Sequence, residues 1–141
     1  MMCSRRRVLG LGLAGSLAAC SEGKTQSLPS VSVQEAQRRL ADGKAVLVDI
    51  RRPEEWAETG VAQGAIKLDM TAADFAPRLQ ALSQANPGKE IDLICRTANR
   101  SGAVQKALTA QGWSHVVNVR GGMAGNFSDT GWIKAGLPVV K

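Results

Sequence analysis

Short apolar runs that alternate with helical segments constrain this chain more than any other feature. The runs "AVLVDI" (45–50), "IDLIC" (91–95) and "HVVNV" (115–119) have apolar residues at neighbouring positions, as in strands covered on both faces, and "GAIKLD" (64–69) predicts a further short strand. Strands that alternate with helices pair in parallel through right-handed crossovers. The pattern predicts an α/β fold, and 141 residues are enough for one such domain but not for two comfortable ones.

Start and stop signals place the helices between these runs. The four predicted helices span 32–43, 53–60, 72–83 and 101–112. Ser32 and Glu35 form a capping box at the first, and Pro53 is typical of the first turn of the second. Thr71 and Asp74 are the capping candidates for the third. The tail "GWIKAGLPVVK" is expected to close with a short helix or a turn.

The first 30 residues carry an export signal and a linker. "MMCSRRRVLGLGLAGSLAAC" has a basic start, a short apolar stretch and small residues before Cys20, which is typical of a secretory signal. "SRRRVLG" resembles a twin-arginine signal, and "LAAC" resembles a bacterial lipobox, in which cleavage leaves a lipid on Cys20. The alternative is a general secretory signal with a chance cysteine.

These motifs predict three segments: a lipoprotein-type signal peptide over 1–19, the lipidated Cys20 with a flexible tether over 20–30, and a domain over 31–141. The polar, Pro-containing "SEGKTQSLPS" is typical of such a tether. The lipid would hold the protein on a membrane surface in the bacterial periplasm, at the inner or the outer membrane.

Charge and aromatic content argue against nucleic acid as a partner. The formal charge of the whole chain is +6, but the signal contains three of the 18 basic residues, so 15 would remain against 12 acidic ones. The chain has no Tyr, two Phe and three Trp, which leaves few platforms on which bases could stack.

Cys95 is the one cysteine expected to remain a free thiol. Of the three cysteines, Cys3 leaves with the signal and Cys20 carries lipid, so no intramolecular disulfide is expected. A single His and a single free Cys also exclude a Cys/His zinc site by count, and no cofactor is expected.

The segment "CRTANRS" (95–101) combines this thiol with a strand-to-helix loop. In parallel sheets, ligands bind where the carboxyl ends of strands meet such loops. Backbone N–H groups of the loop, the helix N-terminus and the charges of Arg96 and Arg100 would lower the pKa of the thiol and supply a thiolate at neutral pH. The alternative is a buried cysteine that only fills space, which is disfavoured because burying two unpaired arginines is costly. His115 is expected at the surface or at a strand end.

Three blocks resemble the rhodanese family, a group of sulfurtransferase modules. They are "VLVDIRRPEEWAETG" with "GAIKLD", the loop "CRTANRS", and "VRGGM" followed by Trp132 and "AGLPV". The resemblance covers most of 31–141 and implies a single α/β domain around a five-stranded parallel sheet with helices on both faces. The sequence departs from the family at Val61, where His is frequent, and in a longer segment between Gly122 and Trp132, which predicts an extra loop at the rim of the site.

The resemblance also implies roles for individual residues. Cys95 would be the nucleophile that accepts sulfur, and Asp49 would support the site. The substrate-binding residues would be Arg96, Thr97, Ala98, Asn99, Arg100, Ser101 and Arg51.

The implied activity is that of a thiosulfate sulfurtransferase. The Cys95 thiolate would take sulfur from a small anionic donor such as thiosulfate, and the resulting persulfide would pass its sulfur to cyanide or a thiol. This assignment requires a thiol that solvent can reach. One alternative is a sulfur carrier or sulfur-ligand binding module without turnover, with a sulfur-relay protein as a candidate partner. Another is a cysteine phosphatase or arsenate reductase, but their loops place five residues between Cys and Arg, and here only four separate Cys95 from Arg100.

Overall fold

The computed structural model describes residues 27–141, so the predicted signal peptide, Cys20 and most of the predicted tether lie outside the described residues. The helices are α1 (Val33–Ala41), α2 (Pro53–Thr59), α3 (Phe75–Ala85) and α4 (Asn99–Ala110). The strands are β1 (Ser30–Val31), β2 (Ala45–Asp49), β3 (Val61–Ala62), β4 (Ile66–Lys67), β5 (Glu90–Ile94), β6 (Val116–Val119) and β7 (Val139–Val140).

Five of these strands form one parallel sheet in the order β1-β6-β5-β2-β4, which confirms the predicted fold class. The central pair, β2 and β5, is in register from Ala45 opposite Glu90 to Asp49 opposite Ile94. The carboxyl ends of these two strands therefore meet at one edge of the sheet, where Cys95 follows β5 directly.

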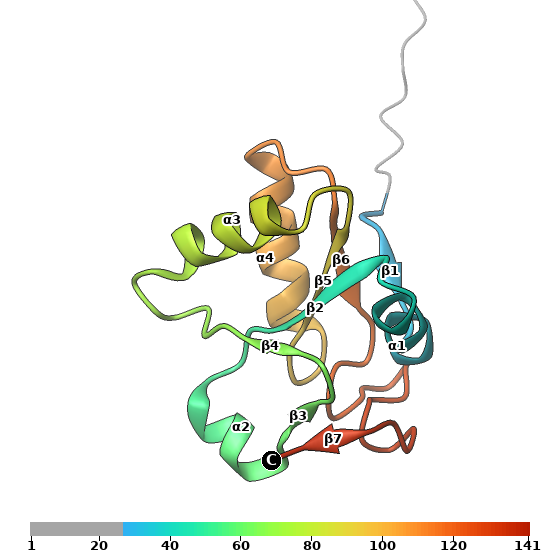
Figure 1. Ribbon diagram of the computed structural model, residues 1–141. Coiled ribbons are helices and arrows are strands. Elements are labelled where there is room, and N and C mark those ends of the chain that lie inside the picture. The colour runs from blue at the N-terminus through green and yellow to red at the C-terminus, as the bar shows by residue number, and fades with distance from the viewer. Residues whose placement is uncertain (1–26) are drawn as a thin grey trace, which may run out of the picture.

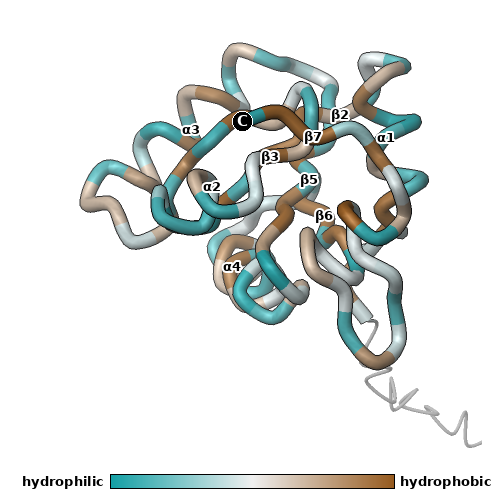
Figure 2. The backbone as a smooth tube through the Cα atoms, turned by 90° about the horizontal axis from the view of Figure 1, so that it is seen from below, coloured by the Kyte–Doolittle hydropathy of each residue, from teal (hydrophilic) through white to brown (hydrophobic). Residues whose placement is uncertain are grey.

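Each face of the sheet packs against different helices. On one face, Val46, Val48 and Leu93 join Leu79 of α3 and Leu108 of α4 in a buried cluster. A second cluster joins α1 to the other face through residues that alternate with the first set, among them Val33, Ala36, Leu47 and Ile94. Figure 1 shows α3 and α4 on the side of the sheet away from α1, and in Figure 2 the hydrophobic stretches of β5 and β6 lie inside a surround of helices and loops.

The capping predictions have mixed outcomes. The N–H of Glu35 donates to Ser32 Oγ at 3.1 Å, so Ser32 caps α1, but the carboxylate of Glu35 accepts from Arg38 and does not complete the predicted capping box. Thr71 does not cap α3, because its N–H and hydroxyl both donate to Asp69 Oδ1. Asp74 occupies the N-cap position of α3 without a side-chain hydrogen bond. The helix after Cys95 begins at Asn99, two residues earlier than predicted.

Three of the four two-residue strands, β1, β3 and β7, were not predicted. β1 lies at the end of the predicted tether and pairs with β6, Ser30 lying opposite Asn118. β7 lies in the tail predicted as a helix or turn and pairs antiparallel with β3 in a small second sheet. Within residues 27–141, no helix has the length and apolar character needed to cross a membrane.

Candidate active site

The loop after β5 turns sharply to place the start of α4 above the thiol of Cys95. Ala98 makes this turn with φ at 78°, the only positive φ of a non-glycine residue in the described chain. The N–H of Ser101 consequently lies 3.4 Å from Cys95 Sγ, and Ser101 Oγ lies 3.3 Å from it. The thiol is thus held at the N-terminus of α4, where the helix dipole favours an anion.

The loop also holds a row of unused hydrogen-bond donors. Within the described residues, the backbone N–H groups of residues 96 to 100 have no protein acceptor. The N–H of Ser101, next in the chain, donates to the sulfur. Successive N–H groups in a loop that leads into a helix form a concave anion site. The N–H groups of Thr97, Ala98 and Asn99, three of the predicted substrate-binding residues, belong to this row.

A glycine turn supports the back of this loop. The N–H groups of Met123 and Ala124 donate to the carbonyls of Cys95 and Arg96, each at 2.8 Å. A Cβ atom at Gly122 would lie only 2.5 Å from the carbonyl oxygen of Cys95, so no larger residue fits there without movement. Gly122 therefore allows two chain segments far apart in sequence to lie in contact.

The expectation that solvent reaches the thiol of Cys95 is wrong for this conformation. Cys95 is only 1% exposed and packs in the cluster with Leu93 and Leu108. It lines neither of the two cavities beside the loop. A donor therefore reaches the sulfur only after the atoms that cover it move.

Arg100 forms an ion pair in place of the free charge that the sequence predicted. Its Nη1 and Nη2 donate to Oε2 and Oε1 of Glu55 in α2, at 2.8 and 2.6 Å. The guanidinium lowers the pKa of the Glu55 carboxyl to about 2, and Glu55 in turn raises the pKa of Arg100. Glu55, which the sequence did not single out, therefore neutralises one of the two loop arginines.

Arg51 is part of the framework beneath the site. It is 1% exposed, and its Nε and Nη2 donate to the carboxylate of Asp49. The remaining N–H groups reach the carbonyls of Gly60 and Glu55 and the hydroxyl of Thr59. All five of its donors are engaged, so Arg51 would have to release one of these partners to bind a substrate. Asp49, predicted to support the site, is the residue that pairs with Arg51.

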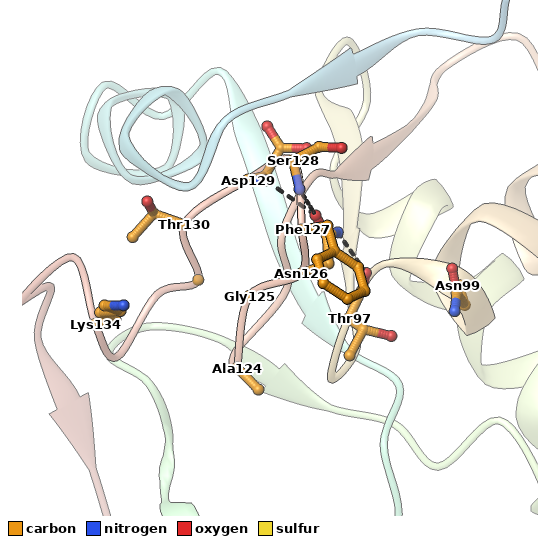
Figure 3. Close-up of a pocket in the computed structure, with 11 residues that line it drawn as sticks. Thr97, Asn99, Ala124, Gly125, Asn126, Phe127, Ser128, Asp129, Thr130 and Lys134 are labelled. Carbon is orange, nitrogen blue, oxygen red and sulfur yellow. Dashed lines mark hydrogen bonds between the residues drawn. The ribbon is translucent and has the colours of Figure 1, made fainter.

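Two cavities flank the loop. An open one of about 640 Å³ lies between Thr97 and Asn99 on one side and the segment 124–131 on the other (Figure 3). This segment is the long stretch predicted as an extra loop, and Asn126 ties it to the site by donating to the carbonyl of Thr97 at 3.0 Å. A smaller cavity of about 110 Å³ lies on the other side and is lined by Arg51, Glu55 and Arg96 among others.

Asn118 is a site residue that the sequence reasoning missed. Ser101 is fully buried, and its Oγ donates to Asn118 Oδ1 at 2.6 Å. Asn118 Nδ2 donates to the carbonyl of Ala98 at 3.3 Å. The signal in the sequence was a polar residue within the apolar run "HVVNV".

His115 lies at the start of β6, the end of the sheet away from Cys95. Its Nε2 is 2.8 Å from Ser83 Oγ, and its ring stacks on Trp113 with centroids 5.5 Å apart. Among the described residues there is no group of three or more His, Cys, Asp or Glu side chains placed to hold a metal ion.

Comparison with known proteins connects this geometry to a family. Residues 32–127, most of the described chain, match the model of the rhodanese-like domain. The chain belongs to the rhodanese-like domain family. A sulfurtransferase of Allochromatium vinosum is 32% identical over 111 residues, which cover 78% of this chain and 92% of that protein.

Solved structures of rhodanese domains share the fold. A rhodanese-like domain protein of Staphylococcus aureus is 26% identical, with a TM-score of 0.58 over 81% of this chain and 100% of that one. A thiosulfate sulfurtransferase of Pseudomonas aeruginosa is 26% identical, with a TM-score of 0.64 over 80% of this chain and 20% of that one. The rhodanese domain and the sulfurtransferase relative support a sulfurtransferase-like function at the level of the family.

Proposed function

We propose that this rhodanese domain is a sulfurtransferase in which Cys95 takes a sulfur atom from a small anionic donor such as thiosulfate. The observation that carries the proposal is the row of free N–H groups from residue 96 to residue 100, beside a sulfur that already accepts from Ser101. Such a row stabilises a thiolate, and it offers the same donors to the outer sulfur of a persulfide.

The proposed chemistry has two displacement steps. The Cys95 thiolate attacks the outer sulfur of thiosulfate, an S–S bond forms, and sulfite leaves with the electron pair of the broken bond. A thiolate or cyanide then attacks the outer sulfur of the persulfide and restores the Cys95 thiolate. No redox cofactor is needed, because in each exchange one bond to the transferred sulfur forms as another breaks, and no electrons are gained or lost overall.

Arg96 is the exposed arginine of the loop and is accessible to an incoming donor. Within the described residues, its side chain has no ion-pair or hydrogen-bond partner. The charge of Arg100 is already balanced by Glu55, which occupies two of its five N–H donors, and Arg51 is held by Asp49. We therefore assign donor capture to Arg96 and to the loop N–H groups, with Arg100 contributing when its ion pair opens.

Intact-mass measurement of the full chain tests this proposal. After incubation with thiosulfate, the wild type is expected to gain the mass of one sulfur atom, and Cys95→Ser is expected to gain none. Because Cys95→Ser keeps Cys3 and Cys20, it shows whether the sulfur resides on Cys95. Equal gains in both proteins, or hydrolysis of a phosphate ester in place of sulfur uptake, would contradict the assignment.

A sulfur carrier without turnover is the second candidate, and it requires the same access to the buried Cys95 as the enzyme does. A carrier and an enzyme both form the persulfide, but only the enzyme produces thiocyanate continuously when thiosulfate and cyanide are both present. Repeated turnover supports the enzyme. A single equivalent of thiocyanate supports the carrier, with a sulfur-relay protein as the partner that removes the sulfur.

We also propose that the chain is a periplasmic lipoprotein whose signal is cleaved before Cys20. The support is the sequence of residues 1–20 alone: the basic start, the short apolar stretch and "LAAC". In a bacterial host, the wild type is expected in the membrane fraction, and Cys20→Ser is expected to lose the lipid and leave that fraction. The same distribution for both proteins would contradict the proposal.

A further inference from the structure

We propose that Asn118 is a positioning residue for the thiol, because it holds the hydroxyl hydrogen of Ser101 away from Cys95 while the sulfur is protonated. The proposal rests on Cys95 as the reacting group of the proposed function. It concerns a residue of β6 that makes no hydrogen bond to the sulfur and that binds both Ser101 and the carbonyl of Ala98. The proposed effect on the thiol acts through Ser101.

The orientation of the Asn118 amide follows from its surroundings. Its Nδ2 faces the carbonyl oxygen of Ala98 at 3.3 Å, and an oxygen placed there would face another acceptor. Oδ1 must therefore face Ser101 Oγ, which lies 2.6 Å away. An amide oxygen only accepts, so the hydroxyl of Ser101 is the donor in this short hydrogen bond.

A hydroxyl has one hydrogen, and three acceptors lie near Ser101 Oγ: Asn118 Oδ1 at 2.6 Å, and the carbonyl of Ala98 and the sulfur of Cys95, each at 3.3 Å. While the hydrogen lies in the shortest of these contacts, to Asn118, Ser101 does not donate to Cys95. With that hydrogen on Asn118, a lone pair of Ser101 Oγ faces the sulfur at 3.3 Å and can accept from the S–H group. The arrangement thus fits a protonated thiol. When the sulfur becomes an anion, Ser101 must turn its hydrogen from Asn118 toward Cys95, and Asn118 Oδ1 then loses its donor.

Asn118 consequently opposes ionisation of the thiol and acts against the loop N–H groups, which favour it. Ser101 is fully buried and Asn118 is half-buried, so water replaces at most part of the hydrogen bond that Asn118 gives up. The free thiol is kept less reactive until a donor enters the loop.

Other charged groups also lie near the sulfur, and they act on it equally in every variant compared. Arg100, paired with Glu55 of α2, lies close enough to Cys95 and Asp49 to interact with both charges, and Arg51 of β2 neutralises Asp49. Arg96 follows Cys95 in the chain. A change at Asn118 leaves these charges in place but removes two hydrogen bonds, one to Ser101 and one to the carbonyl of Ala98, and a Ser101→Ala background separates the two effects.

Ultraviolet titration of the full chain tests the proposal by following the absorbance of the thiolate. The chain contains no Tyr, so no tyrosinate overlaps this signal. Each variant is read against its own Cys95→Ser counterpart, which removes the contributions of Cys3 and Cys20. This measurement needs no reagent to reach the buried sulfur.

The Asn118→Leu variant removes the acceptor and keeps a similar side-chain size. Ser101 can then donate to the sulfur, and the titration midpoint of Cys95 is expected to fall by about 0.5 to 1 pH unit. In a Ser101→Ala background the same substitution is expected to change nothing. The control is Asn86→Leu, which removes another asparagine bound to a backbone carbonyl, at the end of α3, and it is expected to leave the midpoint unchanged.

Two outcomes would overturn the proposal. One is a midpoint that rises or stays in place in Asn118→Leu. The other is an equal fall with and without Ser101, which would mean that Asn118 acts by another route. If circular dichroism shows that Asn118→Leu is unfolded, Asn118→Ala takes its place, with the same expected fall of the midpoint and the same dependence on Ser101.

The titration is independent of sulfur transfer. A shift that depends on Ser101, in a protein that gains no sulfur, would sustain the role of Asn118 and remove the proposed function. Sulfur uptake on Cys95 without such a shift would sustain the proposed function and remove the role of Asn118.

Discussion

At the scale of single residues, Glu55 sets how much positive charge the site presents. It accepts two hydrogen bonds from Arg100, and the same carboxylate accepts from the N–H of Arg52 at the start of α2. The carboxylate of Glu55 thus caps the first turn of α2. It also pairs with Arg100, to which a dianionic donor could otherwise bind. The charge balance of the loop therefore depends on a residue outside it.

Replacing Glu55 by Gln is expected to improve the use of thiosulfate. Gln keeps an acceptor for Arg52 but no longer neutralises Arg100, so kcat/KM for thiosulfate is expected to rise about five-fold, equivalent to about 1 kcal/mol. Steady-state kinetics measure the change. Glu54→Gln is the control, because it removes the same charge one residue away, in an exposed side chain. A fall in kcat/KM, or an equal rise in both variants, would contradict the role of Glu55.

At the scale of elements, the loop after β5 depends on the turn after β6. Cys95 and Arg96 supply the carbonyls, and Met123 and Ala124 supply the N–H groups. The turn has room for this contact only because Gly122 has no side chain and has a φ of 59°. The segments that follow β5 and β6 are therefore hydrogen-bonded to each other at the candidate site.

Substitution of Gly122 by Ala is expected to destabilise the domain and displace the loop. The added Cβ would meet the carbonyl oxygens of Cys95 and Arg96 at 2.5 and 2.6 Å. Gly43→Ala is the matched control, since Gly43 has a φ of 70° and nothing within 4 Å of the added atom. Chemical denaturation is expected to show a loss of about 1 kcal/mol for the control and at least about 2 kcal/mol more for Gly122→Ala. Equal losses would mean that the backbone angle alone matters.

The sequence predicted the elements that carry their own signal. β2, β5 and β6 were visible as apolar runs, and the Ser32 cap and the end of α2 at Gly60 were visible in local chemistry. β1 and β7 were not, because a two-residue strand exists only through its partner, and Ser30 meets Asn118 across 88 positions of sequence. Pairing across such distances leaves no local pattern.

The candidate site divides in the same way. The position of Cys95 at a strand end and the loop that follows it could be predicted, since both are consecutive in sequence. The partners of the loop could not, because Glu55, Asn118 and Met123 come from three other segments. The expected freedom of Arg100 was wrong for this reason: nothing next to it in the sequence shows that α2 delivers a carboxylate.

At the scale of the whole molecule, a buried carboxyl makes stability depend on pH. Asp92 of β5 is fully buried between the sheet and α1, and burial raises its pKa to about 6. Arg39 Nη2 lies 3.1 Å from Asp92 Oδ1, but its N–H groups are not directed at the carboxylate, so this ion pair makes no hydrogen bond. The folded domain therefore binds the proton of Asp92 more tightly than the unfolded chain does.

The free energy of unfolding is expected to fall as the pH rises from about 4 to about 6. In this window the unfolded chain has lost the proton of Asp92 and the folded domain has not, so rising pH favours unfolding by roughly 2 to 3 kcal/mol in total, and the penalty stays constant above it. Asp92→Asn is expected to remove this slope in denaturant titrations run at several pH values. Asp42→Asn, at the exposed end of α1, is expected to keep it. A slope that persists in Asp92→Asn would assign the dependence to another group.

The direction of β1 determines how the domain would be displayed on a support. β1 runs parallel to β5, so the chain enters the sheet from the side on which its strands begin, while Cys95 stands where β5 ends. A molecule fixed by its upstream segment, to a lipid layer or to a bead, would therefore be attached on the side opposite its reacting edge.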